Sequence, residues 1–264
     1  MLCVRHPLGA CGLPVIALHN LVKRYGQFTA VDDVDLEVAA GEIHGFLGPN
    51  GAGKTTTLRM IAGLLKPTSG RILVNGHDLA TSPEAAKASL GYIPDRPFIY
   101  EKLTAGEFLR FHAGLYGVDG DGVTGRVHEM LDLFELRRWE NELVESFSHG
   151  MKQRLVMSAA FLHRPQAVVV DEPMVGLDPR GARLIKDVFR KMSENGVAIL
   201  MSTHTLEVAQ EMCDRISIIL KGKIIAEGTV DEVRRLAGAG DDHLTSVFLR
   251  LTGGSALQEL DEIV

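Results

Sequence analysis

The sequence has 264 residues, of which 45% are hydrophobic, 23% charged and 6% aromatic. This balance is typical of a globular protein and excludes a disordered, collagen-like or disulfide-stapled chain. With 28 Lys and Arg against 34 Asp and Glu, the net charge of −6 excludes a general electrostatic attraction to nucleic acid or anionic lipid.

The cysteines and the apolar runs indicate the compartment. Cys3, Cys11 and Cys213 are an odd number without paired spacing, which favours a reduced, cytosolic environment over a disulfide framework. The longest apolar runs are far shorter than the ~20 residues of a transmembrane helix. We expect residues 1–14 to be an N-terminal extension, disordered or misassigned, and residues 236–264 to be a peripheral C-terminal tail.

The first predicted elements form an antiparallel β edge. Residues 15–18 begin a strand pattern, and residues 31–38 alternate apolar and acidic side chains as a half-buried strand does. Residues 43–47 are a short apolar run, and residues 55–65 carry apolar side chains at helical spacing. A glycine-rich loop therefore joins a strand to a helix.

This loop matches the pattern G-x-x-x-x-G-K-[ST] in full, with the residues Gly48, Pro49, Asn50, Gly51, Ala52, Gly53, Lys54 and Thr55. Glycines let backbone N–H groups approach a polyphosphate, while Lys54 supplies a positive charge and Thr55 a hydroxyl for Mg²⁺. The alternative is a glycine-rich turn with a solvated lysine. The position between a strand and a helix favours nucleotide triphosphate binding instead.

The segment at about residues 95–162 has little β pattern, and we expect an inserted helical subdomain there. Thr104 and Glu107 form a capping box that begins a helix, and residues 127–136 predict a second amphipathic helix. Residues 114–125 are rich in glycine and predict a mobile loop.

The second half of the chain alternates strands with helices. Residues 167–170 and 198–201 predict buried parallel strands, and helical segments follow each of them, at residues 179–191 and 205–213. A hairpin at residues 216–226 closes the pattern. This alternation predicts a three-layer α/β core.

Polar side chains follow both buried strands. Asp171 and Glu172 come after the first, where Asp171 is a candidate Mg²⁺ ligand and Glu172 a candidate for orienting the attacking water. Alone, such a pair is more often a polar strand end, and only the phosphate loop makes it a candidate catalytic pair. His204 follows the second strand, at the edge where ligands of such sheets bind.

Together these residues resemble the ATP-binding cassette (ABC) family over residues 15–232. Residues 147–154 (FSHGMKQR) resemble its signature motif, residues 176–179 its D-loop, and His204 its switch histidine. The resemblance implies an α/β P-loop NTPase (RecA-like) fold. It predicts a three-layer core with an antiparallel β edge, an inserted all-helical subdomain, and an ATPase domain at residues 15–235.

The resemblance also implies roles for single residues, with ATP and Mg²⁺ as cofactors. Glu172, His204 and Lys54 would be catalytic, and residues from Gly48 to Thr56 would surround the phosphates. Tyr25 would stack on adenine, although it also fits a strand-end core tyrosine. Ser148 and Gly150 would contact the γ-phosphate of ATP held by the opposite subunit of a head-to-tail dimer. Asp178 would lie at the seam, and Thr55, Asp171 and Asp95 would hold the metal.

Two departures from the family pattern stand out. Asp95 replaces the usual Q-loop glutamine, which touches Mg²⁺ and senses the transmembrane partner, although a carboxylate also ligates Mg²⁺. In the signature, His149 and Met151 replace a glycine and a glutamine. His149 is either a solvated residue at a helix start, the favoured interpretation, or a pH-sensitive neighbour of the γ-phosphate.

The expected partners are a second ABC ATPase subunit, identical or related, and transmembrane permease subunits. The chain would then lie on the cytoplasmic face of the cell membrane, held there only through the permease and without nucleic acid. Residues 244–253 resemble the tail of ATPases paired with ABC-2 type exporter permeases, which favours export. The alternatives are a soluble non-transport ABC ATPase that regulates a partner complex and, more remotely, a P-loop kinase or GTPase.

Overall fold

The computed structural model describes residues 13–96 and 98–236. Apart from residues 13, 14 and 236, the predicted N-terminal extension and C-terminal tail lie outside the described residues, as does the exporter-like stretch 244–253. The boundaries proposed for the ATPase domain and its helical subdomain stay predictions.

Two sheets form the framework. The antiparallel sheet has the strand order β2-β1-β4-β5, with β1 at Ile16–Tyr25, β2 at Phe28–Val38, β4 at Ser69–Val74 and β5 at His77–Asp78. The second sheet has the order β10-β9-β3-β8-β7-β6, and its bounds are β3 Ile43–Leu47, β6 Leu90–Ile93, β7 Ala167–Asp171, β8 Ala198–Thr203, β9 Arg215–Leu220 and β10 Lys223–Gly228. Its strands are parallel except β10, which pairs antiparallel with β9.

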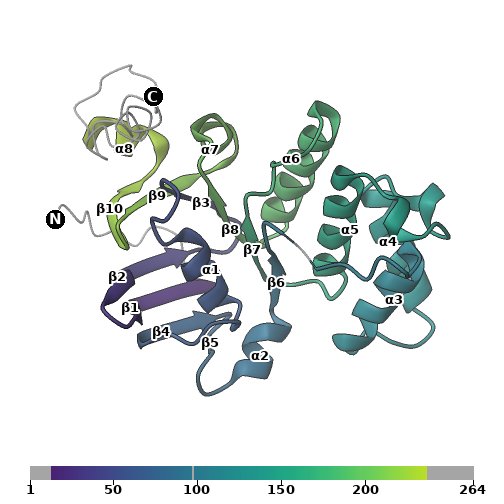
Figure 1. The fold of residues 1–264 in the computed structure, drawn as a ribbon, viewed down its shortest axis with the longest axis horizontal. Helices are drawn as coiled ribbons and strands as arrows, with labels where there is room; N and C mark the ends of the chain where they lie inside the picture. Colours follow the sequence, from purple (N-terminus) through teal and green to yellow (C-terminus); the bar gives the residue numbers. More distant parts are fainter. Residues whose placement is uncertain (1–12, 97, 237–264) are drawn as a thin grey trace.

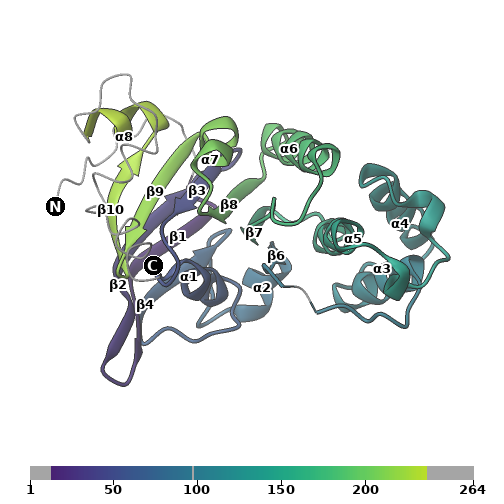
Figure 2. The same ribbon diagram turned by 45° about the horizontal axis from the view of Figure 1, so that its top comes forward.

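Eight α-helices lie around the two sheets in the described residues (Figure 1). They are α1 Lys54–Ile61, α2 Pro83–Ala88, α3 Ala105–Leu115, α4 Val123–Leu133, α5 His149–Phe161, α6 Pro179–Glu194, α7 Leu206–Met212 and α8 Val230–Leu236. Helix α1 contacts both sheets, through β2 and β7. Figure 2 shows α6 and α7 together on one side of the molecule, while α3, α4 and α5 gather at the end away from the antiparallel sheet.

The predicted three-layer α/β architecture and its antiparallel edge are confirmed. Strands β4, β5 and β6 and helix α2 were not predicted. The predicted loop at residues 114–125 was too long, because α3 continues to Leu115 and α4 begins at Val123. The predicted helix at residues 127–136 was placed too late, since α4 ends at Leu133 and Glu135 adopts a left-handed conformation with φ of 55°.

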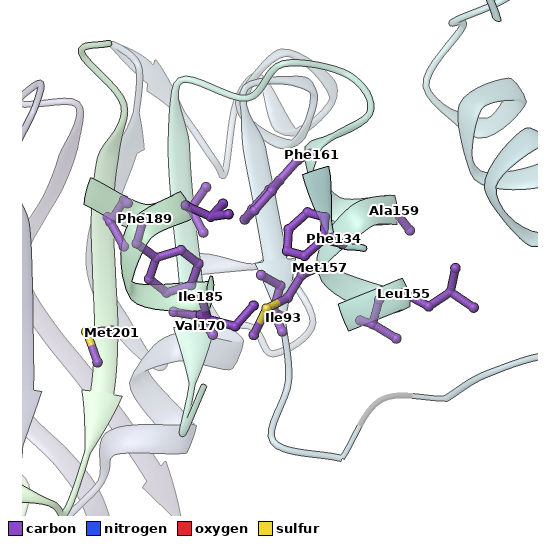
Figure 3. Close-up of a cluster of buried hydrophobic side chains, with 14 of the residues drawn as sticks. Ile93, Phe134, Leu155, Met157, Ala159, Phe161, Val170, Ile185, Phe189 and Met201 are labelled. Atoms are coloured by element: carbon purple, nitrogen blue, oxygen red, sulfur yellow. The ribbon is translucent and has the colours of Figure 1, made fainter. Parts of the chain in front are cut away.

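Two apolar clusters hold the layers together. One lies between the two sheets and includes Phe46 and Leu58, both fully buried. The other joins the six-stranded sheet to the helices, and in Figure 3 Phe161 of α5 and Phe189 of α6 lie in it near Val170 of β7. Because burial of apolar area is the dominant stabilising term, this second cluster fixes α5 against the strand that carries Asp171.

Candidate functional site

The phosphate loop, residues 48–53, passes so close to two strands that a side chain has no room at Gly48 or Gly53. A Cβ atom at Gly48 would lie 2.4 Å from the carbonyl oxygen of Ile219, and one at Gly53 would lie 2.5 Å from that of Ala30. Gly53 also has φ of 113°, a left-handed conformation that favours glycine. The loop between β3 and α1 is therefore held directly against β2 and β9.

Lys54 is buried at the start of α1, and its ammonium lies inside the phosphate loop. Its Nζ atom donates hydrogen bonds to the carbonyl oxygens of Gly48, at 2.6 Å, and Pro49, at 3.3 Å. Burial lowers the pKa of Lys54, and the charges of Glu172 and Asp171 partly offset that effect. The sequence prediction that these three charged groups share one site is therefore supported by their electrostatic interaction.

Asp171 ends β7 with its side chain buried. Strands β7 and β8 are in register at Asp171 and Ser202, and the Ser202 hydroxyl donates a hydrogen bond to Oδ1 of Asp171. Within the described part of the chain, Oδ2 of Asp171 is buried and has no hydrogen-bond partner. An unpaired buried carboxylate oxygen is costly unless a cation or another donor satisfies it, so this oxygen fits a metal ligand.

Glu172 and His204 meet at the carboxyl ends of β7 and β8. Nδ1 of His204 lies 2.8 Å from Oε1 of Glu172, and the backbone N–H of Glu172 donates to the carbonyl oxygen of Ser202 at 3.1 Å. Glu172 has φ of 50°, which is uncommon for a residue with a side chain and is often found at functional sites. The structure thus brings together two of the three residues predicted to be catalytic, and Lys54 interacts with the same carboxylate.

Ser148 and Asp178 cap the two helices that begin within the signature and at the end of the D-loop. The Ser148 hydroxyl accepts a hydrogen bond from the Met151 N–H at 3.3 Å, and Oδ1 of Asp178 accepts one from the Gly181 N–H at 3.0 Å. Figure 1 shows α5, which follows Ser148, in a different part of the molecule from α1, which follows the phosphate loop. Within one chain, Ser148 and Gly150 therefore belong to a separate surface.

Tyr25 and Asp95 lie on the surface, and their predicted roles stay predictions. Tyr25 ends β1, pairs across the hairpin with Phe28, and has Lys23 Nζ 5.1 Å from its ring centroid. Asp95 is half exposed, with Arg96 Nε 3.9 Å from one carboxylate oxygen. Among the residues that the structure describes, no three His, Cys, Asp or Glu side chains gather as a metal site.

Sequence reasoning missed two features. Ser202 lay just beyond the strand predicted at residues 198–201 and was given no role, and its signal is a polar residue directly after an apolar run. A groove of about 320 Å³ was not foreseen. It lies between the turn after α1, α2, β6 and the helices α3 and α5, and Tyr92, Phe98 and Tyr116 are among its lining residues. Phe98 is 83% exposed, which is unusual for so large an apolar side chain.

No helix in the described ranges is both long and apolar enough to span a bilayer.

The comparisons with known proteins agree with this geometry. A family model described as "ABC transporter" matches residues 31–175. The probable multidrug ABC transporter ATP-binding protein YbhF of Escherichia coli is 40% identical over 226 residues, which are 86% of this chain but 39% of that protein. The chain therefore spans about two fifths of the length of this relative.

Two further likenesses cover more of the matched proteins. The daunorubicin resistance ATP-binding protein DrrA3 of Streptomyces coeruleorubidus is 38% identical over 90% of this chain and 74% of its own length. A dimeric structure of the ATP-binding cassette MJ0796, in a post-hydrolysis state with ADP and Pi, is 25% identical. Its TM-score is 0.74, and the match covers 81% of this chain and 98% of that one.

Proposed function

The chain belongs to the ABC transporter family, and from this membership we propose that it binds and hydrolyses ATP to power a separate membrane permease. The observation that carries the proposal is the contact between Glu172 and His204, beside Asp171 and the buried ammonium of Lys54. A phosphate loop alone would support nucleotide binding. A carboxylate held by a histidine next to that loop supports hydrolysis.

In the proposed reaction the triphosphate lies in the loop from Gly48 to Thr56. Backbone N–H groups and the Lys54 ammonium bind the phosphate oxygens and stabilise the charge that develops on them. Glu172 orients the attacking water and accepts its proton. His204, whose Nδ1 is 2.8 Å from Glu172, holds that carboxylate in place.

The proposed cofactor is Mg²⁺, with Asp171 and the Thr55 hydroxyl as its protein ligands and Asp95 as a further candidate. The unpaired Oδ2 of Asp171 supports this assignment, since Ser202 occupies the other carboxylate oxygen. Mg²⁺ characteristically binds through one or two carboxylates plus substrate phosphates and water, so a large cluster of side chains is not required. When bound, it neutralises charge on the phosphates.

The proposed active form is a dimer, either of two copies or of this chain with a relative. Helix α5, which Ser148 caps and Gly150 belongs to, lies in a different part of the molecule from α1, and this fits the delivery of these residues to the nucleotide of the opposite subunit. The likeness to a dimeric cassette with ADP and Pi supports the same arrangement. Asp178, which caps α6, would then lie at the seam.

The proposed partner is a permease that exports its cargo, with the chain on the cytoplasmic face. The names of the two curated relatives, a multidrug transporter protein and a daunorubicin resistance protein, support export. The groove is lined by Tyr92, Phe98 and Tyr116, and the first two lie three positions on either side of Asp95, the residue in the partner-sensing Q-loop position. We assign permease contact to this groove.

The test uses the purified chain and its Glu172→Gln variant. We expect the variant to bind ATP as the wild type does, to lose turnover, and to accumulate an ATP-dependent dimer in size-exclusion chromatography with light scattering. A variant that hydrolyses ATP at the wild-type rate removes Glu172 from its role. A wild-type chain that turns over ATP at full speed as a strict monomer contradicts the shared site.

The permease partnership is tested separately by co-purification with any protein of about six hydrophobic spans that is encoded beside this chain. If the chain instead copurifies with a complex that has no membrane subunit, the alternative of a non-transport ABC ATPase applies.

A further inference from the structure

The segment from Glu172 to Asp178, called here the 172–178 segment, connects the carboxylate beside the phosphate loop to the cap of α6. It is folded in tight turns, because the Val175 N–H donates to the Glu172 carbonyl at 3.2 Å and the Leu177 N–H donates to the Met174 carbonyl at 3.4 Å. These two turns keep the path from Glu172 to Asp178 compact.

The first turn of α5 touches the middle of this segment. A Cβ atom at Gly176 would lie 2.4 Å from Cδ2 and 2.7 Å from Nε2 of His149, so the imidazole ring lies directly against the Gly176 backbone. At the next position, a Cβ atom at Gly150 would lie 3.5 Å from Cδ2 of Leu177. The His149 ring therefore lies between the start of α5 and the backbone of Gly176.

The ring makes a contact that the usual glycine at this signature position lacks. His149 is an exposed residue at the start of α5, as expected, but its ring has a specific neighbour rather than only solvent. In a helix that begins with glycine, the turn would face Gly176 without any side chain between them. The contact therefore depends on the histidine that stands in place of that glycine.

We propose that His149 is a positioning residue that couples the two nucleotide sites in which this chain takes part. The proposal rests on the shared-site dimer described above. Glu172 serves the ATP bound by its own chain, whereas Ser148 and Gly150 serve the ATP of the partner. His149 joins these two groups mechanically, since it lies beside Ser148 in sequence and packs against the segment that begins at Glu172.

The first test measures the contact itself, in nucleotide-free protein, by amide hydrogen exchange of residues 174–178. We expect His149→Ala to speed exchange there several-fold and His149→Phe, which keeps a ring, to stay at the wild-type rate. His77→Ala is the matched control, because His77 is an exposed histidine on β5 away from this segment. Equal exchange in wild type, His149→Ala and His149→Phe overturns the proposal.

The second test measures ATP turnover of the same variants. We expect His149→Ala to lower kcat about tenfold and to leave KM for ATP unchanged. This loss is smaller than the ~100-fold fall in rate that a ~1 Å misplacement of a reacting group can cause. His149→Phe should restore most of kcat. A loss of kcat that Phe does not restore, or a rise in KM with kcat unchanged, overturns the proposal.

The two failures are distinguishable. If the wild type neither hydrolyses ATP nor forms a nucleotide-dependent dimer, the proposed function fails, whereas the exchange experiment still reports on the contact. If the wild type does both and His149→Ala behaves like His77→Ala in both measurements, only the coupling role is lost.

Discussion

The imidazole of His204 and the carboxylate of Glu172 form a hydrogen bond of 2.8 Å between residues 32 positions apart in the sequence. Glu172 is largely buried, with 14% of its side chain exposed, whereas 56% of the His204 side chain is exposed. Glu172 is therefore held at the end of the sheet, whereas His204 faces solvent.

Replacing His204 by Ala is expected to lower kcat for ATP by about 100-fold, the lower range for a positioned acid–base group, with nucleotide affinity retained. Steady-state kinetics and equilibrium binding measure the two effects. Because the proposed mechanism has both residues act on one water, adding His204→Ala to Glu172→Gln should cost little more. Additive losses in the double variant would show that the histidine works independently of Glu172.

Replacing Lys54 by Ala is expected to weaken ATP binding by about 10- to 100-fold, since charge-assisted hydrogen bonds contribute about 1.5–3 kcal/mol. Calorimetric titration with ATP measures this. Lys54→Arg keeps the charge but not the compact ammonium that fits between the carbonyls of Gly48 and Pro49, so it should rescue binding poorly. Wild-type affinity in Lys54→Ala would refute the loop assignment.

The loop glycines separate steric exclusion from backbone strain. Gly48→Ala puts a methyl group 2.4 Å from the Ile219 carbonyl, so we expect loss of ATP binding and a clear fall in melting temperature. Gly51→Ala meets open space and carries only the strain of φ near 75°, about 1–2 kcal/mol. Calorimetric melting and ATP titration of both variants are the measurements. Equal losses in the two would contradict the close approach of the loop to β9.

Tyr25 is tested by its contribution to base binding. If it stacks on adenine, Tyr25→Ala should weaken ATP binding by the equivalent of about 1–3 kcal/mol and leave inorganic tripolyphosphate binding unchanged. Tyr25→Phe should restore affinity. Phe28→Ala, at the paired hairpin position, is the control. A loss shared by ATP and tripolyphosphate would assign Tyr25 to the shape of the hairpin.

His163 makes folding stability depend on pH. Burial lowers its pKa, the charge of Arg126 lowers it further, and the hydrogen bond between Nε2 and the Leu90 carbonyl opposes both. In the described structure Nδ1 is buried without a partner, and the ring stacks on Tyr116 with centroids 3.9 Å apart. The folded state therefore favours the neutral ring.

As the pH falls below about 6.5, the unfolded chain gains a proton at this residue before the folded chain does. The free energy of unfolding should therefore decrease on acidification until the lower folded pKa is reached. Denaturant unfolding at a series of pH values measures this, and His163→Phe should reduce the slope in that window. His112, whose pKa burial also lowers, supplies a residual slope. An unchanged slope in His163→Phe would remove His163 as the cause.

Local patterns predicted the elements that carry the site. The phosphate loop, the strands before Asp171 and His204, and the helix after Thr104 each have a signal within about ten residues, because glycines, capping residues and apolar runs act locally. The strand Ser69–Val74 escaped prediction, since Ser69, Gly70 and Arg71 hide its short apolar half. Helix α2, with six residues, is too short to show a period.

Local sequence patterns could not predict the contacts between segments that are distant in the sequence. The hydrogen bond from Ser202 to Asp171 depends on the register of β7 and β8, which a single sequence does not encode in any one window. The packing of His149 on Gly176 depends on how α5 docks against the sheet. The resemblance to the family named which residues matter, and the structure supplied which of them touch.

The apolar cluster that joins the six-stranded sheet to the helices (Figure 3) also limits how far α5 can move. Phe161 of α5 packs edge-on against Phe189 of α6, with ring centroids 6.3 Å apart, and tilted against Phe134 beyond α4 at 5.7 Å. A rotation of α5 against β7 would break the packing of these rings. The start of α5, which carries the signature motif, and the end of β7, which carries Asp171, are therefore held in one packed unit, and we expect a force on the helical end to move both.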